Sequence, residues 1–447
     1  MLLRESIKTI KLSIPLILGE FVQMLANIID MAMVGKISYD HLAAAALAGS
    51  IISVPFIIGV GITISLLQQI SSKHGKKDIN QISHFLFNGV FLCFCFALLI
   101  SILIHFGAIG VLRLNQDKTV ALLAVPYLRL LGWSLIPLLV FLALKHFIDG
   151  LQKTTMPMIL SLIFLPINIF INWSLIYGFE RVPRLELLGA GLGTLISRTL
   201  MLITLIAVIL VHKEFRKYLA VIKQWNIKKQ TIWELLSIGL PIGLQLVMEI
   251  SAFAVSAIMI GSLGSVQQAA HQIAFNCILF TLMLTLGLAQ GCSIRISYAL
   301  GQNNWNQILM IAKSTLLITL FYGLLCSFIL YIYKDKIVLL FNKNSFVISQ
   351  ASSLLIFAGV FLAVNALQIV SASILRGIKD VYMPTIATFF AYWLIAIPLG
   401  YILGLKMEME VAGVWIGFII GLSFSFLLLF LRIVKLFKRF INNDRLE

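Results

Sequence analysis

The chain has 447 residues, of which 60% are hydrophobic and only 12% are charged, and its mean hydropathy is +1.02. This balance excludes a soluble globular protein and indicates a polytopic membrane protein. A formal net charge of +16 could suggest a nucleic-acid partner, but the basic residues are concentrated in alternate short loops, so we expect no such partner and take the charge as a topology signal, with a contact to membrane lipids.

We place about twelve membrane spans along the chain, since ~20 apolar residues suffice to cross a bilayer. In chain order they cover residues 10–34, 42–67, 82–106, 122–147, 158–179, 187–211, 236–260, 269–294, 308–333, 347–374, 386–405 and 411–431. The first is too long for the core of a signal peptide. Both termini and the lysine-rich central connection fall on one side, which the positive-inside rule assigns to the cytoplasm. We therefore expect a multi-pass protein of the bacterial cytoplasmic membrane with cytoplasmic termini.

The two halves of the sequence repeat each other. Pro15 corresponds to Pro241 and Gly75 to Gly301 at an offset of 226, and Gly150 corresponds to Gly377 at 227. An even number of spans separates matching positions, so the repeats run in parallel. This pattern predicts an all-α membrane protein of two six-helix bundles, residues 1–220 and 221–447, related by a pseudo-two-fold axis along the membrane normal.

Two carboxylates lie inside predicted spans, where an acid costs ~2.5–3.5 kcal/mol and therefore usually faces a cavity. Asp30 shares a helix face with Gln23 and Asn27, and Glu249 shares one with Gln245. At an offset of 226 Glu249 corresponds to a glutamine and Asp30 to a serine, so the acids are not symmetry mates. The pattern favours a transporter with titratable or cation-binding groups at membrane depth.

Several strings together resemble the multidrug and toxic compound extrusion (MATE) family, in its NorM-like branch. They are Ile14-Pro15 with Asp30-Met31-Ala32-Met33-Val34-Gly35, Ala269-Ala270-His271-Gln272-Ile273-Ala274, Leu375-Arg376-Gly377-Ile378-Lys379-Asp380, and Tyr392-Trp393 with Leu399-Gly400-Tyr401. The resemblance covers essentially the whole chain. It implies alternating access and the export of bulky, mostly cationic amphipathic drugs in exchange for Na⁺ or H⁺.

The resemblance also implies a cation- or proton-binding set. Its members are Asp30, Asn168, Asn172, Ala190 and Thr194 in the first half and Glu249 and Asn365 in the second. Na⁺ would be held by Asp30, Asn168, Asn172 and Thr194. Asn365 stands where NorM-like relatives usually carry an aspartate, and Asn172 where some carry a second acid, so each half keeps one carboxylate.

Other polar residues in the spans have two readings. Arg198, in the middle of the sixth span, is a candidate counter-ion for Asp30 that would disfavour Na⁺ there. Gln272 pairs with Asn276, and Asn365 with Gln368, at helical spacing; together with Gln23, Asn27 and Gln245 they could line a substrate cavity or simply hold helices together.

Three other functions are weighed against drug export. No Gly-x-x-x-x-Gly-Lys-Ser/Thr string occurs, which argues against an ATP-driven pump. A flippase for lipids or lipid-linked sugars would need several deep cations, and we expect only Arg198. For a membrane enzyme, His105, His146 and His271 lie in different spans, and we expect none to have a carboxylate at helical spacing. We therefore expect no enzyme, no cofactor beyond the coupling ion, and a monomer.

Overall fold

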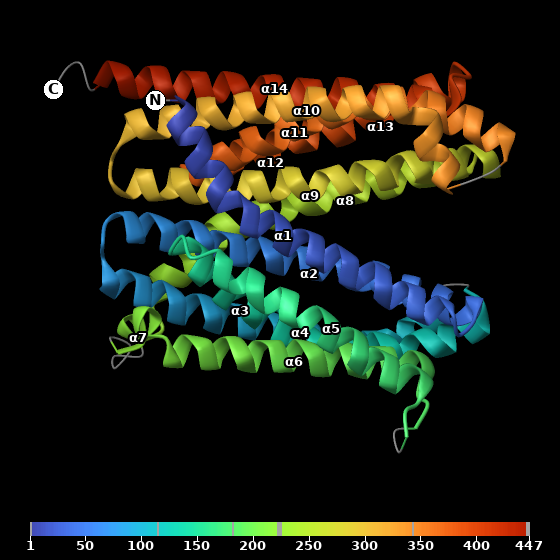
Figure 1. Ribbon diagram of the computed structural model, residues 1–447, viewed down its shortest axis with the longest axis horizontal. Coiled ribbons are helices and arrows are strands. Elements are labelled where there is room, and N and C mark those ends of the chain that lie inside the picture. Colours follow the sequence, from blue (N-terminus) through green and yellow to red (C-terminus); the bar gives the residue numbers. More distant parts are fainter. Residues whose placement is uncertain (1, 114–115, 181–182, 221–225, 342–343, 444–447) are drawn as a thin grey trace. The chain divides into compact units, whose positions relative to one another are not determined.

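A computed structural model describes residues 2–113, 116–180, 183–220, 226–341 and 344–443 (Figure 1). The described chain is almost entirely helical. The helices of the first half are α1 (Leu2–Gly35), α2 (Tyr39–Gly75), α3 (Ile79–Gly107), η1 (Ala108–Arg113), α4 (Lys118–Gly150), α5 (Thr155–Tyr177), α6 (Glu186–Val211) and α7 (Lys213–Ala220). Those of the second half are α8 (Lys229–Gly261), α9 (Ser265–Gly301), α10 (Trp305–Phe341), α11 (Ser345–Gly377), α12 (Tyr382–Thr388), η3 (Phe389–Ala396), α13 (Ile397–Tyr401), η4 (Ile402–Lys406) and α14 (Glu410–Asn443).

Twelve candidate membrane spans lie within these described residues, which confirms the all-α membrane fold predicted above. The helices are longer than predicted because hydropathy misses their polar ends. Helix α2 continues past residue 67 to Gly75, and the polar side chains of Gln68 and Gln69 in this extension are buried inside the protein. Helix α7, inside the predicted linker, was not expected; its Phe215 packs on Phe147 of α4 with ring centroids 6.2 Å apart.

The internal repeat reappears in the helix boundaries. Helix α2 begins at 39 and ends at 75, and adding 226 gives 265 and 301, the ends of α9. Helix α4 runs from 118 to 150, and adding 227 gives 345 and 377, the ends of α11. Even the left-handed residues that end these helices correspond, since Lys77 and Asn303 both have positive φ. The two halves therefore share one helical plan.

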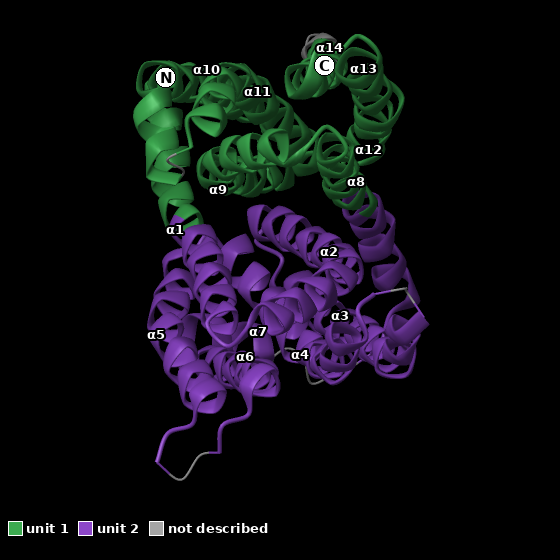
Figure 2. Ribbon diagram, turned by 90° about the vertical axis from the view of Figure 1, so that its right-hand side faces the viewer, with its two compact units in different colours: residues 1–17, 244–447 green, residues 18–243 purple. Residues whose placement is uncertain are grey.

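Two compact units divide the chain, one of residues 18–243 and the other of residues 1–17 and 244–447 (Figure 2). We call them unit 2 and unit 1. The predicted division into 1–220 and 221–447 remains a prediction. The first half of α1 is grouped with the second half of the sequence, and the first half of α8 with the first.

Each unit is built around one central helix. In unit 2, α4 contacts α2, α3 and α6 and carries much of the buried apolar core. In unit 1, α11 contacts α9, α10 and α14 in the same way. The eleventh span is partly π-helical: the Ile397 backbone N–H bonds to the Tyr392 carbonyl, just before Pro398. Such π-turns often occur at functional sites.

Candidate functional site

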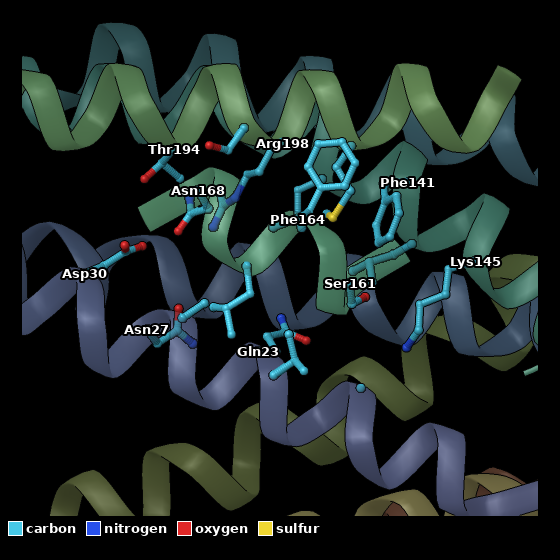
Figure 3. A pocket seen from close by; sticks show the side chains of 18 residues that line it. Gln23, Asn27, Asp30, Phe141, Lys145, Ser161, Phe164, Asn168, Thr194 and Arg198 are labelled. Atoms are coloured by element: carbon cyan, nitrogen blue, oxygen red, sulfur yellow. The ribbon is translucent and has the colours of Figure 1, made fainter. Parts of the chain in front are cut away.

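Unit 2 contains a cavity of about 130 Å³ between α1, α4, α5 and α6 (Figure 3). Its polar lining residues are Gln23, Asn27, Asp30, Lys145, Ser161, Asn168, Thr194, Ser197 and Arg198. A volume of this size holds several waters, whereas pockets for drug-sized ligands measure ~300–1,000 Å³. In this conformation the cavity is therefore suited to ions, water or part of a larger molecule.

Asp30 lies at one end of this cavity, near the end of α1 (Figure 3). Asn172 of α5 is buried and donates from its Nδ2 to the Asp30 Oδ1 at 2.7 Å. This hydrogen bond joins the two helices and fixes the carboxyl group. Gln23 and Asn27 occupy the same face of α1, as the spacing predicted, and both are exposed to the cavity.

Arg198 of α6 lines the same cavity and acts electrostatically on Asp30. Its Nη1 donates to the Ser134 Oγ of α4 at 2.6 Å. The guanidinium is thus held within the unit rather than reaching a membrane surface. This placement is the one expected of an internal counter-ion, although the role itself stays a prediction.

The amide oxygens of Asn168 and Asn172 are both buried and have no hydrogen-bond partner within the described residues. Asn168 lines the cavity with Asp30, whereas the Asn172 oxygen lies against Gly193 of α6, so the Asn168 oxygen is the unpaired acceptor on the cavity side. Thr194 also lines the cavity, and its hydroxyl donates to the Ala190 carbonyl at 2.8 Å, which leaves its lone pairs available. Ala190 itself lies in the apolar core of the unit.

Glu249 forms the corresponding cluster in unit 1. Gln245 donates from its Nε2 to the Glu249 Oε1 at 3.0 Å, one turn apart on α8. Arg376 of α11 is close enough to interact electrostatically with this carboxyl group, and so is Tyr392 of the π-helical stretch. Gln368 of α11 is fully buried. Each unit therefore pairs one carboxylate with one arginine.

The remaining predicted cavity residues are less closely connected to these clusters. Asn365 is buried on α11, three residues before Gln368. Gln272 is exposed and donates to Asn276 at 3.2 Å within α9. This pair bonds within one helix, which agrees with the packing alternative as well as with a cavity wall.

The sequence analysis missed three charged groups, Lys145, Asp149 and Arg376. The expectation that only Arg198 lies deep was wrong, because Lys145 also lines the cavity of unit 2. The expectation for His146 was also wrong, since Asp149 follows it at helical spacing. The repeat offered a signal: 149 + 227 = 376, so Asp149 and Arg376 are equivalent positions near the ends of the two central helices.

The chain is similar to known proteins over nearly its whole length. The MatE family model matches residues 15–174 and 241–402. The chain is 31% identical over 439 residues to the multidrug resistance protein MdtK of Yersinia enterocolitica, covering 96% of this chain and 95% of that protein. It is 30% identical over 442 residues to the multidrug resistance protein NorM of Aliivibrio fischeri, covering 97% and 95%.

Solved structures agree on the fold. A crystal structure of MATE in the bent conformation superposes with a TM-score of 0.90 at 19% identity, over 98% of this chain and 96% of the other. The eukaryotic MATE transporter AtDTX14 gives a TM-score of 0.85 at 22% identity, over 97% and 96%. With a family model that spans both halves and relatives similar over nearly their whole length, the chain belongs to the MatE family of multidrug and toxic compound extrusion transporters, in its NorM-like branch.

Proposed function

We propose that the protein is a secondary active transporter that exports bulky, amphipathic, mostly cationic compounds by alternating access, in exchange for Na⁺ or H⁺. The names of its relatives, multidrug resistance proteins NorM and MdtK, support drug export. The observation that carries the exchange mechanism is Asp30, a carboxylate that faces a cavity in unit 2 and is fixed there by Asn172. Such an acid at membrane depth is characteristic of ion and proton pathways.

In this proposal Asp30 binds the coupling ion in one state and releases it in the other. Na⁺ would be held by the carboxylate together with the Asn168 amide oxygen and the Thr194 hydroxyl, and the Asn172 oxygen would join them only by turning away from Gly193. Arg198 opposes this choice, because its positive charge lowers the local affinity for a second cation. A proton would need only the carboxyl group. Glu249 provides a titratable group in unit 1, at a position that does not correspond to Asp30 in the repeat.

The substrate would contact a set of polar residues in the two units, namely Gln23, Asn27, Gln245, Gln272, Asn276 and Gln368. A cavity of about 130 Å³ is too small for a whole drug. Binding therefore requires a conformation in which the cavity is larger, as alternating access supplies. We also propose cytoplasmic termini in a bacterial inner membrane, action as a monomer, and no cofactor beyond the coupling ion.

Lipid flipping is the second candidate, and Lys145 favours it, because two cations rather than one line the cavity of unit 2. Each of these cations has an acid nearby: Asp149 lies 4.0 Å from Lys145, and Asp30 acts on Arg198. The charges are thus nearly balanced, whereas a phosphate site needs an excess of positive charge. We therefore place cationic drugs first.

The test uses proteoliposomes loaded with ethidium, on which a Na⁺ gradient and a pH gradient are imposed separately. Wild type is compared with Asp30→Asn and Glu249→Gln. Glu186→Gln is the control, because Glu186 pairs with His41 and Arg184 and does not line the cavity. We expect one gradient to drive ethidium and Asp30→Asn to abolish the movement. If neither gradient moves any cationic dye, drug exchange is refuted, and assays of lipid flipping follow.

A further inference from the structure

Asp149 is a buried acid that the exchange mechanism above does not use. It lies in the last turn of α4 with 0% of its surface exposed, and neither of its carboxyl oxygens has a hydrogen-bond partner in the part of the chain that the structure describes. The ammonium group of Lys145, one turn earlier, is 4.0 Å away. An ionised carboxylate in such surroundings lacks the donors that normally compensate its lost hydration.

Another buried ion pair in the same protein shows what a structural pair looks like. In unit 1, Arg295 of α9 donates to the Glu5 carboxylate, to the Glu5 carbonyl at 2.8 Å and to the Thr9 hydroxyl. Every interaction there is a hydrogen bond, which is the condition under which a buried pair offsets its desolvation. Lys145 and Asp149 do not meet this condition. The 4.0 Å separation between the Lys145 ammonium group and Asp149 argues against a purely structural role, and so do the two Asp149 oxygens that accept no hydrogen bond from the described residues.

The pair is connected to the site of exchange. Lys145 lines the same cavity as Asp30, at the opposite end (Figure 3), and Asp149 follows it one turn later on α4. Glu20 of α1 adds a second negative charge near Asp149. Of the neighbouring histidines, His146 hydrogen-bonds to the Thr63 backbone and His74 to the Gly150 backbone, and among the described residues no histidine donates to the Asp149 oxygens.

We propose that Asp149 and Lys145 form a second proton-binding site, which exchanges protons with the water of the cavity. The ammonium group of Lys145 gives one proton to a carboxylate oxygen of Asp149: an N–H bond breaks and an O–H bond forms. The neutral amine then takes a proton from the cavity and becomes ammonium again. The net change is one proton taken up, and Asp149 becomes a neutral acid while Lys145 keeps its charge.

This proposal goes beyond the exchange at Asp30, and it rests on the proposed function for its physiological use. When Asp149 is protonated, the second site would hold a proton near one end of the cavity, while Asp30 binds and releases the coupling ion at the other end. The two ends would then differ in protonation during the cycle. Na⁺ is not a candidate ligand at this second site, because the Lys145 ammonium already occupies the position of a cation.

The experiment is a drug-free titration, so its result is independent of whether ethidium is a substrate. Infrared difference spectra are recorded on reconstituted full-length protein after a pH jump, in the stretching region of protonated carboxyl groups. We expect a band in wild type that Asp149→Asn removes and that Asp30→Asn leaves in place. Glu214→Gln is the matched control, since Glu214 is an exposed acid paired with Lys153, and it should leave the band unchanged.

Asp149→Asn leaves Lys145 buried without its acid and could unfold the protein, so the double variant Lys145→Met with Asp149→Leu is measured beside it. The double variant removes both charges and should fold, because an ion pair can be replaced by neutral side chains at little cost. It should also lack the band. A band that persists in Asp149→Asn or in the double variant overturns the proposal, as does a wild-type spectrum in which no band depends on Asp149.

Discussion

The amide oxygen of Asn172 lies against Gly193 so closely that a β-carbon on the glycine would approach it to less than 3.0 Å. Gly193 belongs to α6 and Asn172 to α5, and the Asn172 amide in turn holds Asp30 of α1. The absence of a side chain at 193 is therefore a condition for the hydrogen bond that fixes the proposed ion-binding carboxylate.

Gly193→Ala should displace Asn172 and break its hydrogen bond to Asp30. We expect a loss of stability of about 1–3 kcal/mol from overpacking, and ethidium transport reduced nearly to the level of Asp30→Asn. Transport in proteoliposomes and the melting temperature in detergent measure the two effects. Gly49→Ala is the control, because a β-carbon there meets nothing within 4 Å. Normal transport by Gly193→Ala would show that Asn172 does not position Asp30.

Two further glycines should be at least as intolerant of substitution, because a β-carbon at either position would meet backbone atoms. A β-carbon on Gly61 of α2 would approach the backbone of Gly243, and one on Gly287 of α9 would approach the backbone of Ile17, each to less than 3.0 Å. These contacts are equivalent, since 61 + 226 = 287 and 17 + 226 = 243. Backbone cannot rotate away as a side chain can.

We therefore expect Gly61→Ala and Gly287→Ala each to lower the melting temperature and the yield of folded protein by similar amounts. Overpacking of this kind costs about 1–3 kcal/mol or more. Fluorescence-detected size-exclusion chromatography of heated samples measures the change. Gly107→Ala, where a β-carbon has nothing within 4 Å, should behave as wild type. A large effect at one position with none at the other would contradict the equivalence.

The two kinds of ion pair in this protein should differ greatly in their contribution to stability. Arg295→Met removes the buried partner of Glu5 and leaves only the more exposed Lys8, 3.1 Å from the carboxylate, so it should cost up to about 3–5 kcal/mol. Lys153→Met breaks a pair whose side chains are 53% and 52% exposed, which should cost less than about 1 kcal/mol. Melting temperatures of both variants, with Glu5→Gln to complete a double-mutant cycle, measure the difference. Equal losses would show that Glu5 is hydrated despite its burial.

The attachment of α7 should depend on pH. Lys153 hydrogen-bonds to Glu214 and, with its charge, holds the pKa of that carboxyl below its ordinary value of 4.5. A lowered pKa in the folded state stabilises the contact above pH 4.5, and this stabilisation is lost as the pH falls through the folded value. Hydrogen exchange of residues 213–220 should therefore accelerate relative to α4 only at acidic pH.

The Glu214→Gln variant separates this effect from the intrinsic pH dependence of exchange. Its protection in α7 should already be reduced at neutral pH and should change no further on acidification. High salt should have a similar effect on wild type, because exposed charges are screened. Protection that falls equally in wild type and Glu214→Gln would exclude the ion pair as its cause.

Much of the fold could be predicted from the sequence because hydropathy and the internal repeat are strong signals. The repeat at 226 and 227 gives the equivalence of α2 with α9 and of α4 with α11. The polar ends of the helices could not be predicted from hydropathy: Gln68 and Gln69 are polar, yet they lie inside the protein. Helix α7 was missed because its segment is short and basic, and its few apolar residues span too short a stretch to indicate a helix by their spacing.

The site was only partly predictable. Asp30 could be identified because an acid inside an apolar span is costly, and the resemblance placed Asn172 near it. Lys145 and Asp149 could not be identified in this way, because they lie near the predicted end of a span, where charged side chains usually reach water. Their burial depends on tertiary packing around α4, which no local pattern in the sequence specifies.

The compact units change membership at Ile17 in one repeat and at Gly243 in the other, and these positions differ by the repeat offset of 226. In each half of the sequence, the first part of the opening helix is thus grouped with the unit that the other half mainly forms. Two half-length chains that exchanged an opening helical segment, as in domain swapping, would show the same pattern. A chain cut between residues 220 and 229 should therefore work only when both fragments are made together, since each fragment lacks a segment that its own core requires.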